Sequence, residues 1–531
     1  MADSALLNLV LYLPVFAIVA IIALPAQRVD LVRGVTLTAM LAQLALAAWL
    51  YMRFDASLDG LQFETRLPWI VSWGVYYQIG LDGYNLLLVL LTAFLGPLVV
   101  AGAFTAIQKD VKLFYALICA LQFAMIGAFV AQDLFLFYLF WETMLIPLFL
   151  IIGIWGGERR IYATLKFVLY TAFGSILMLA AVIYFVYSLS TTTGVSSFAF
   201  ADLYKAELPL HVQTILLAAF ALSFAIKVPM VPLHTWLPDA HVEAPTAGSV
   251  VLAGVLLKMG TYGFMKLGFP MFPDAARLLA PVFGTLAVVS IIYGACLALV
   301  QTDIKKIIAY SSISHLGYVM LGLVSLDLIG VQGAVMQMVS HGLVAGGLFL
   351  MVGMVYERCH TRELAAYGGL AKLLPLYSVF FALLTLAAIG LPTTSGFTGE
   401  FLVLLGAFRA AWPRFLQGAS YPLVLSASAV AGVVLGAWYM LWFAQRFLFG
   451  PAKAPHRPFP DLNLREKTIL AALVAAVFWL GIFPDEPMKK TELASRQYQQ
   501  LVAAERTGTP VASRAGAVAA LPAQPEPEKT R

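Results

Sequence analysis

Charged side chains are scarce in this sequence. Only 11% of its 531 residues are Asp, Glu, Lys or Arg, whereas hydrophobic residues make up 61% and the mean hydropathy is +0.87. A soluble domain carries about 25% charged residues, so this composition excludes a soluble protein and indicates a polytopic membrane protein. The net charge of +5 is not gathered on a soluble domain, and we expect no nucleic-acid partner.

Cysteine is equally sparse, and the familiar motifs of catalysis are missing. Cys119, Cys296 and Cys359 are scattered without CxxC or metal-ligand spacing, which argues against disulfides and iron-sulfur clusters. The sequence also lacks a P-loop, a GxGxxG turn, a haem signature and a nucleophile-base constellation. We therefore expect this chain to bind no cofactor and no metal ion and to have no redox active site of its own.

What the sequence does contain is apolar runs along nearly its whole length. Each run has the roughly 18 to 25 residues that cross about 30 Å of hydrocarbon. The first run, 6–25, has no basic residue before it, so we interpret it as a retained helix and not as a signal peptide. The predicted fold is an all-α polytopic membrane protein with about fourteen transmembrane helices. We expect them near residues 5–25, 31–52, 84–106, 112–131, 134–154, 164–189, 213–233, 246–268, 279–300, 306–326, 330–356, 376–411, 421–449 and 466–484.

Proline interrupts the seventh and the twelfth of these helices. Residues 220–232 (FALSFAIKVPMVP) and 381–396 (FALLTLAAIGLPTTSG) each run an apolar helix into proline and continue in a polar stretch. Breaks five helices apart predict two inverted five-helix repeats, helices 4–8 and helices 9–13, as in secondary transporters. The predicted parts are helices 1–3 with a polar surface loop at 53–83, two channel repeats, helix 14 and a polar, partly disordered tail. Their bounds are 1–110, 111–268, 279–450, 451–488 and 489–531.

Basic residues gather in alternate loops. The loops that run from odd-numbered to even-numbered helices contain Lys305, Lys306, Arg358 and Arg362 among others, whereas the opposite loops contain far fewer. Cytoplasmic loops are the ones enriched in Lys and Arg. We therefore expect both termini on the non-cytoplasmic side.

Several ionisable residues lie inside the predicted helices. A lysine at the middle of a membrane helix costs about 2.5–3.5 kcal/mol on insertion scales, and ionisable groups at that depth mark ion pathways. We select six of them as the candidate site for proton translocation. They are Glu142, Lys227, Lys258, His315, His341 and Glu400.

For the acid and the two lysines, a structural role is the alternative. Glu142 could be paired permanently to stiffen the bundle, and Lys227 could cap carbonyls that Pro229 leaves open. Lys258 could extend along the helix to reach the membrane surface. We favour a switchable ion pair between Glu142 and Lys227, because moving a charged partner changes the proton affinity of both groups. A desolvated Lys258 could then act as a proton carrier.

The remaining three candidates also have structural alternatives. His315 and His341 could be satisfied hydrogen-bonding residues between helices, although His is the side chain that titrates near neutral pH. Glu400 could be a helix cap, and we interpret it as the far end of the polar line. Four more ionisable residues stand between helices 7 and 8, where their spacing could suit a metal but nearby prolines favour a rigid connector. These four are His234, Asp239, His241 and Glu243.

Two long segments resemble a known family. Residues 234–263 (HTWLPDAHVEAPTAGSVVLAGVLLKMGTYG) and 302–322 (TDIKKIIAYSSISHLGYVMLG) resemble the antiporter-like membrane subunits of respiratory NADH-quinone oxidoreductase, complex I. Relatives include large subunits of multisubunit sodium/proton antiporters and of membrane-bound hydrogenases. Within the family the chain is most similar to the subunit M branch, the counterpart of mitochondrial subunit 4. Two features support this similarity: the sequence motif DAHVEAPTAGSV, and a glutamate at position 400, where sister subunits generally carry lysine.

The resemblance implies a role for each candidate residue. Glu142 is the coupling carboxylate of helix 5, and Lys227 is its partner on the broken helix 7. Lys258 is the central lysine of helix 8. The other three candidates are the exit group on helix 12 and the two histidines that connect these residues along a hydrated axis, namely Glu400, His315 and His341.

The resemblance also implies where the remaining chemistry takes place. It implies a proton-translocating subunit in the membrane arm of complex I, in the bacterial inner (cytoplasmic) membrane. NADH, FMN, iron-sulfur clusters and quinone are then expected in other subunits, and the partners are the other membrane-arm subunits, including sister antiporter-like subunits, with lipid and internal water. The alternatives are a subunit of a cation/proton antiporter or membrane-bound hydrogenase, and a membrane scaffold whose charges are fixed structural pairs.

Overall fold

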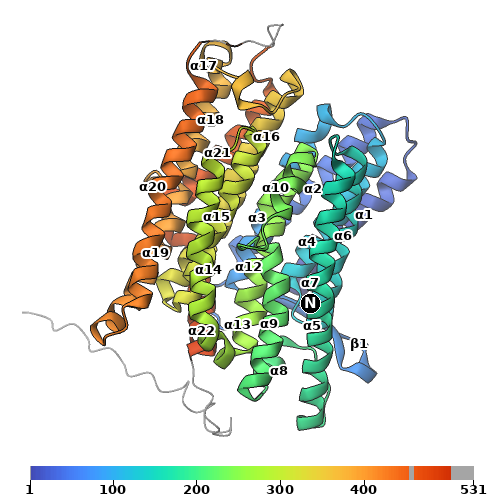
Figure 1. Cartoon of the computed structure of the whole chain (residues 1–531). Helices are drawn as coiled ribbons and strands as arrows, with labels where there is room; N and C mark the ends of the chain where they lie inside the picture. Colours follow the sequence, from blue (N-terminus) through green and yellow to red (C-terminus); the bar gives the residue numbers. More distant parts are fainter. Residues whose placement is uncertain (1, 452, 454–459, 504–531) are drawn as a thin grey trace, which may run out of the picture.

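Long apolar helices standing side by side make up nearly all of the structure (Figure 1). It is a computed structural model that describes residues 2–451, 453 and 460–503. Within these residues, 12 helices are long and apolar enough to cross a membrane, or 13 if one bent pair counts as a span. The predicted class, an all-α polytopic membrane protein, is confirmed.

The first half of the chain contains the helices that end with the eighth predicted span. They are α1 (Ala2–Ala23), α2 (Val29–Arg53), α3 (Gly83–Ala106), α4 (Val111–Val130), α5 (Leu134–Thr143), α6 (Leu145–Trp155), α7 (Arg160–Thr193), α8 (Phe200–Leu203), α9 (Leu210–Lys227), α10 (Trp236–Glu243), α11 (Thr246–Val251), η2 (Leu252–Leu256), α12 (Leu257–Gly263), η3 (Phe264–Gly268) and α13 (Phe269–Met271).

The second half begins with the ninth predicted span and ends with a helix outside the predicted spans. Its helices are α14 (Pro273–Leu299), α15 (Ile304–Ser325), α16 (Leu328–Cys359), η4 (Leu364–Ala366), α17 (Leu370–Leu373), α18 (Pro375–Ala388), α19 (Ser395–Leu416), α20 (Tyr421–Leu448), α21 (Leu464–Ile482) and α22 (Asp485–Ala503).

Two of the predicted spans differ from simple membrane helices. The twelfth, 376–411, is split into α18 and α19 by residues 389–394, as the proline-containing break predicts. The fourteenth, 466–484, is the helix α21, which bends by 68° into α22. The seventh span also ends early, because α9 stops at Lys227 and the chain becomes helical again only at α10.

Aspartate is the N-cap residue of several helices. Asp82, Asp133, Asp303 and Asp327 each accept hydrogen bonds from backbone N–H groups in the first turn of α3, α5, α15 and α16. Such caps satisfy donors that a helix end leaves without an intrahelical partner. Several of the few carboxylates in the chain therefore stabilise helix N-termini.

The predicted surface loop 53–83 is ordered as a β-hairpin. Strands β1 (Gln62–Ile70) and β2 (Val75–Leu81) pair antiparallel, with Thr65 opposite Ile79, and are joined by the short helix η1 (Val71–Trp73). Aromatic and β-branched residues favour strands, and β2 packs on α4 and α5. The polarity of this segment predicted a surface loop, and the strand pairing was not predicted.

The two halves of the chain meet around α16. In Figure 1 the first half lies on the right and the second half on the left, and α14, α15 and α16 are the helices of the second half nearest to the first. Every residue in the most apolar window of α16 is buried, as is 94% of the window in the eighth span, Thr246–Met271. Helix α22 crosses one end of the bundle and contacts α3, α14 and α16. Residues 504–531 of the predicted tail lie outside the described residues.

Candidate functional site

Lys258 is the centre of the site, and the local helix geometry positions it. It lies on α12, between the π-helical segments η2 and η3. π-Helical turns interrupt the regular α-helical ladder and occur often at functional sites. The side chain has no exposed surface. Its ammonium group donates a hydrogen bond to the carbonyl oxygen of Ala253 in η2.

A hydrogen bond joins Lys258 to His341 on α16. Lys258 Nζ and His341 Nδ1 are 2.7 Å apart, and both side chains are buried. An ammonium donates to a deprotonated ring nitrogen, whereas a neutral amine accepts from a protonated one. The same contact therefore holds whether the shared proton is on the lysine or on the histidine.

His341 also faces His315 on α15. The two ring centroids are 5.7 Å apart, and His341 Nε2 has no hydrogen-bond partner among the described residues. A cavity of about 20 Å³, lined by both histidines together with Ser311, Ser340 and Glu400, lies at this point. That volume is enough for about one water molecule, which could connect the two rings.

His315 continues the line to Glu400 on α19. His315 Nδ1 and Glu400 Oε1 are 2.8 Å apart, and Gln337 Nε2 donates to the same oxygen over 3.3 Å. On the other side of the ring, Nε2 lies 3.4 Å from the Tyr439 hydroxyl group. The carboxylate is 7% exposed, so it depends on these partners and not on bulk water for its stabilisation.

Glu142 and Lys227 form a second group at the other end of the line. Lys227 ends α9 and is buried, and its Nζ lies 4.5 Å from the centroid of the Trp141 ring. Neither this ammonium group nor Glu142 Oε1 has a hydrogen-bond partner among the described residues. No ion pair within 4.0 Å joins the two side chains in this part of the structure. The described residues thus show no formed ion pair between Glu142 and Lys227, and the switchable pair stays a prediction.

The two groups are separated by tight backbone packing between α9 and α12. A Cβ atom at Gly260 would lie 2.7 Å from the carbonyl oxygen of Phe224 and 2.8 Å from the backbone nitrogen of Val228. Only glycine permits this approach. Lys258, His341, His315 and Glu400 therefore form one chain of polar contacts, whereas none of the described hydrogen bonds joins Lys227 to Lys258.

The predicted rigid connector between helices 7 and 8 is mostly the helix α10. Asp239 forms an ion pair of 2.7 Å with Lys166, and Glu243 accepts from the backbone nitrogen of Arg159 over 2.9 Å. His241 is fully buried and stacks on Phe349, with no described partner for either ring nitrogen. Within residues 2–451, 453 and 460–503, no cluster of three or more His, Cys, Asp or Glu could hold a metal ion.

Two buried polar features escaped the sequence analysis. Gln337 lies four residues before His341 and thus on the same face of α16, a spacing that could have revealed it. Lys266 of η3 pairs with Asp82 over 2.5 Å. Burial raises the pKa of the Asp82 carboxyl, but Lys266 and the backbone N–H groups of Asn85 and Tyr84 outweigh it, so the pKa lies below its usual range.

A polytopic bundle with a line of ionisable groups in its interior is the architecture of the antiporter-like membrane proteins. The sequence-family model described as NADH:quinone oxidoreductase/Mrp antiporter, transmembrane, matches residues 131–426. Subunit M of NADH-quinone oxidoreductase from Rhodobacter capsulatus is 46% identical over 494 residues, which cover 90% of this chain and 93% of that protein.

Further similarities agree with this match. NADH-ubiquinone oxidoreductase chain 4 from Marchantia polymorpha is 40% identical, over 89% of this chain and 92% of that protein. A chain in the structure of respiratory complex I from Thermus thermophilus with bound NADH superposes with a TM-score of 0.83 at 32% identity, over 93% of this chain and 99% of that one. The chain belongs to the NADH-quinone oxidoreductase subunit M family, which includes chain 4.

Proposed function

We propose that this chain is a proton-translocating subunit in the membrane arm of NADH-quinone oxidoreductase. The observation that carries the proposal is the buried 2.7 Å contact between Lys258 and His341, which continues through His315 to Glu400. A line of groups that can each gain and lose a proton, shielded from lipid by surrounding helices, is suited to moving protons. Nothing in it is suited to making or breaking covalent bonds.

The proposed mechanism starts at the uncompensated pair. When Glu142 approaches Lys227, the ion pair favours the charged forms of both groups, and the change in field reaches Lys258. A proton held by Lys258 then moves to Nδ1 of His341. Release from Nε2 through the small cavity carries the charge to His315 and Glu400.

The energy for this movement comes from outside the chain. Moving one charge against 100 mV costs about 2.3 kcal/mol. NADH, FMN, iron-sulfur clusters and quinone belong, in this proposal, to other subunits of the complex. The partners are neighbouring membrane-arm subunits, and the location is the bacterial inner membrane, with both termini on the non-cytoplasmic side as the alternating basic loops favour.

Substitution of Lys258 tests the proposal. Lys258→Arg keeps the positive charge, but arginine does not lose its proton at accessible pH. We expect NADH-driven proton uptake by inside-out vesicles to fall at least tenfold, while NADH oxidation by an artificial acceptor and assembly of the complex stay unchanged. Lys372→Arg, at an exposed position, is the matched control and should pump normally.

The outcome separates the proposal from its alternatives. Normal pumping by the Lys258→Arg complex would overturn proton transfer through this lysine and favour a scaffold with fixed charges. Sodium-dependent proton exchange that continues without NADH would favour a cation/proton antiporter, the other protein class in the description of the matching family.

A further inference from the structure

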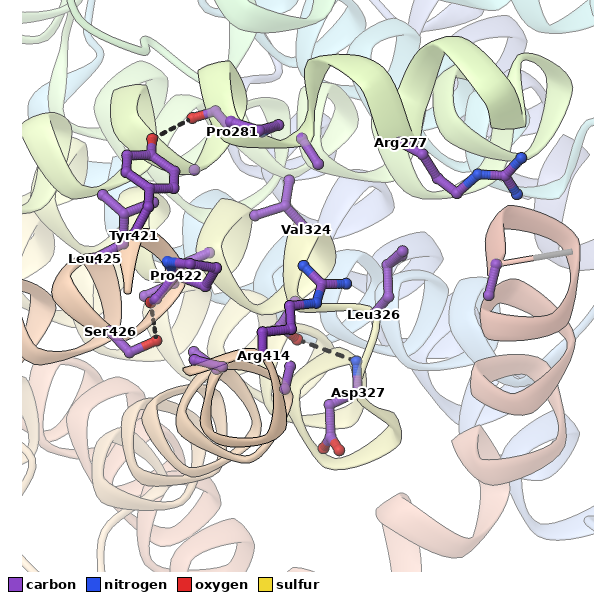
Figure 2. Close-up of a pocket in the computed structure, with 18 of the residues that line it drawn as sticks. Arg277, Pro281, Val324, Leu326, Asp327, Arg414, Tyr421, Pro422, Leu425 and Ser426 are labelled. Atoms are coloured by element: carbon purple, nitrogen blue, oxygen red, sulfur yellow. Dashed lines mark hydrogen bonds between the residues drawn. The ribbon is translucent and has the colours of Figure 1, made fainter. Parts of the chain in front are cut away.

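A larger cavity, with aliphatic walls and a few charged residues, lies at one end of the bundle, away from the proton line. Its volume is about 490 Å³. The start of α14, the end of α15, the end of α19, the start of α20 and the end of α22 surround it (Figure 2). Because helix ends line it, the cavity lies where the bundle leaves the hydrocarbon region.

Two arginines line the cavity, and Arg414 supplies its open positive charge because Arg277 is paired with Asp274. Arg277, in the second turn of α14, is held in place by Asp274 at 2.5 Å and by the carbonyl oxygen of Val502 at 3.1 Å. Arg414, near the end of α19, extends into the cavity towards Val324 and Leu326 (Figure 2). Among the described residues Arg414 forms no ion pair within 4.0 Å, so its charge is open to a ligand.

The acidic residue in the lining does not neutralise Arg414. Asp327 caps α16 by accepting hydrogen bonds from Ile329 and Gly330, and its carboxylate lies 3.7 Å from Arg409. Figure 2 shows this carboxylate pointing away from the Arg414 guanidinium group. The cavity therefore presents positive charge above walls that are largely aliphatic.

The surface beside the cavity is apolar and outward-facing. Helix α20 is only 28% buried in its most apolar window, the lowest value among the 12 candidate spans of the described chain. Val424 on α20 and Val282 on α14 are more than half exposed, and Tyr421, bonded to the carbonyl oxygen of Pro281, stands between them. A ligand with a charged head in the cavity could lay an acyl chain along these helices.

We propose that this cavity, lined by Arg277 and Arg414, binds the headgroup of an anionic phospholipid. Guanidinium groups bind phosphate oxygens in bidentate fashion, and a basic pocket between membrane helices suits an anionic headgroup. The lipid fits better than a soluble anion because the cavity continues into an exposed apolar surface. The site is independent of the proton line, so failure of the proposed function leaves it untouched.

Lipid binding to the purified complex tests the site. After delipidation, dioleoylphosphatidylglycerol is titrated and the adducts on this subunit are followed by native mass spectrometry. We expect Arg414→Gln to weaken binding roughly fivefold, which corresponds to about 1 kcal/mol per basic residue near a membrane surface. The Arg277→Gln/Arg414→Gln double variant should bind still more weakly. Arg496→Gln, an exposed change on α22 at the same end of the bundle, should bind as the unchanged protein does.

Three results would overturn the proposal. One is equal binding of phosphatidylglycerol by the double variant and the Arg496→Gln control. Another is displacement of the lipid by inorganic phosphate at similar concentration, which would indicate a soluble-anion site. The last is a density map of the complex in phosphatidylglycerol nanodiscs with a neighbouring polypeptide in the cavity; phosphate density at Arg414 would support the proposal.

Discussion

At the scale of residues, the most unusual feature of the described chain is that neither Lys227 Nζ nor Glu142 Oε1 has a hydrogen-bond partner. Leaving a buried charge without a partner costs more than pairing it, and removing one member of a buried pair typically costs about 3–5 kcal/mol. Lys227 is stabilised here by the face of Trp141, a cation–π contact of 4.5 Å. In this conformation the lysine contacts an aromatic face and forms no salt bridge with Glu142 among the described residues.

Glu142→Ala should remove that possibility while leaving the fold intact. Glu142 acts electrostatically on Lys227, so its removal takes away the carboxylate with which the lysine would pair. We expect proton pumping per NADH oxidised to fall at least tenfold, measured in inside-out vesicles. Glu158→Ala, outside the spans, is the control. A normal proton-to-electron ratio in the Glu142→Ala complex would remove Glu142 from the mechanism.

The residues of the site were accessible from the sequence, but their connections were not. A lysine or glutamate in an apolar run is visible in any hydropathy pattern. The pairing of Lys258 with His341, 83 positions apart, depends on how α12 packs on α16. Gln337 and Tyr439 were missed because neither side chain is charged at neutral pH, although the four-residue spacing of Gln337 from His341 could have revealed it.

At the scale of elements, close packing of α16 on α19 places Glu400 beside His315. A Cβ atom at Gly399 would lie 2.7 Å from the Cα atom of Gln337. Backbone cannot move aside as a flexible side chain can, so any larger residue would push the helices apart.

Gly399→Ala should therefore impair the line without touching an ionisable group. We expect destabilisation of about 1–3 kcal/mol, as overpacking usually produces, and a several-fold loss of pumping because Glu400 moves from His315. Gly436→Ala on α20, where nothing lies within 4 Å of the added atom, should change neither. Thermal unfolding and vesicle pumping measure the two effects, and normal pumping by the Gly399→Ala complex would show that this helix contact does not set the geometry.

Helices were easier to predict than the departures from them. Apolar length and proline placement predicted the spans and both breaks, because lipid requires satisfied backbone groups. The π-helical segments η2 and η3 left no mark in composition. The hairpin between α2 and α3 was hidden because the polar and charged residues of β1 made the segment resemble a surface loop. The two inverted repeats stay a prediction.

At the scale of the whole molecule, α22 ties the two halves together. Its Tyr498 hydroxyl group donates to the carbonyl oxygen of Leu323, and Lys490 donates to the carbonyl oxygen of Phe54. Gln332 donates to the carbonyl oxygen of Met488. Helix α22 thus links α2, at the beginning of the chain, to α15 and α16.

Removing α22 should weaken the packing between the two halves of the chain and lower the thermal stability of the protein. A chain ended after residue 484 loses the burial of Tyr498 and Val502, roughly 1.5–3 kcal/mol for each apolar side chain. We expect its midpoint of thermal unfolding in the purified complex to fall by several degrees. A chain ended after residue 503 keeps these contacts and should unfold as the full chain does. Equal midpoints for the two truncations would show that α22 does not hold the halves.

The burial of the central part of α16, residues 330–355, restricts how neighbouring subunits can act on the protein. Because the most apolar window of α16 is buried and His341 is only 4% exposed, we expect a neighbouring subunit to act on this histidine through the surrounding helices. A conformational change in a neighbouring subunit would then reach His341 either as a shift in the positions of the surrounding helices or as a change in electric field. The buried histidine is thus shielded from direct contact and remains sensitive to both effects.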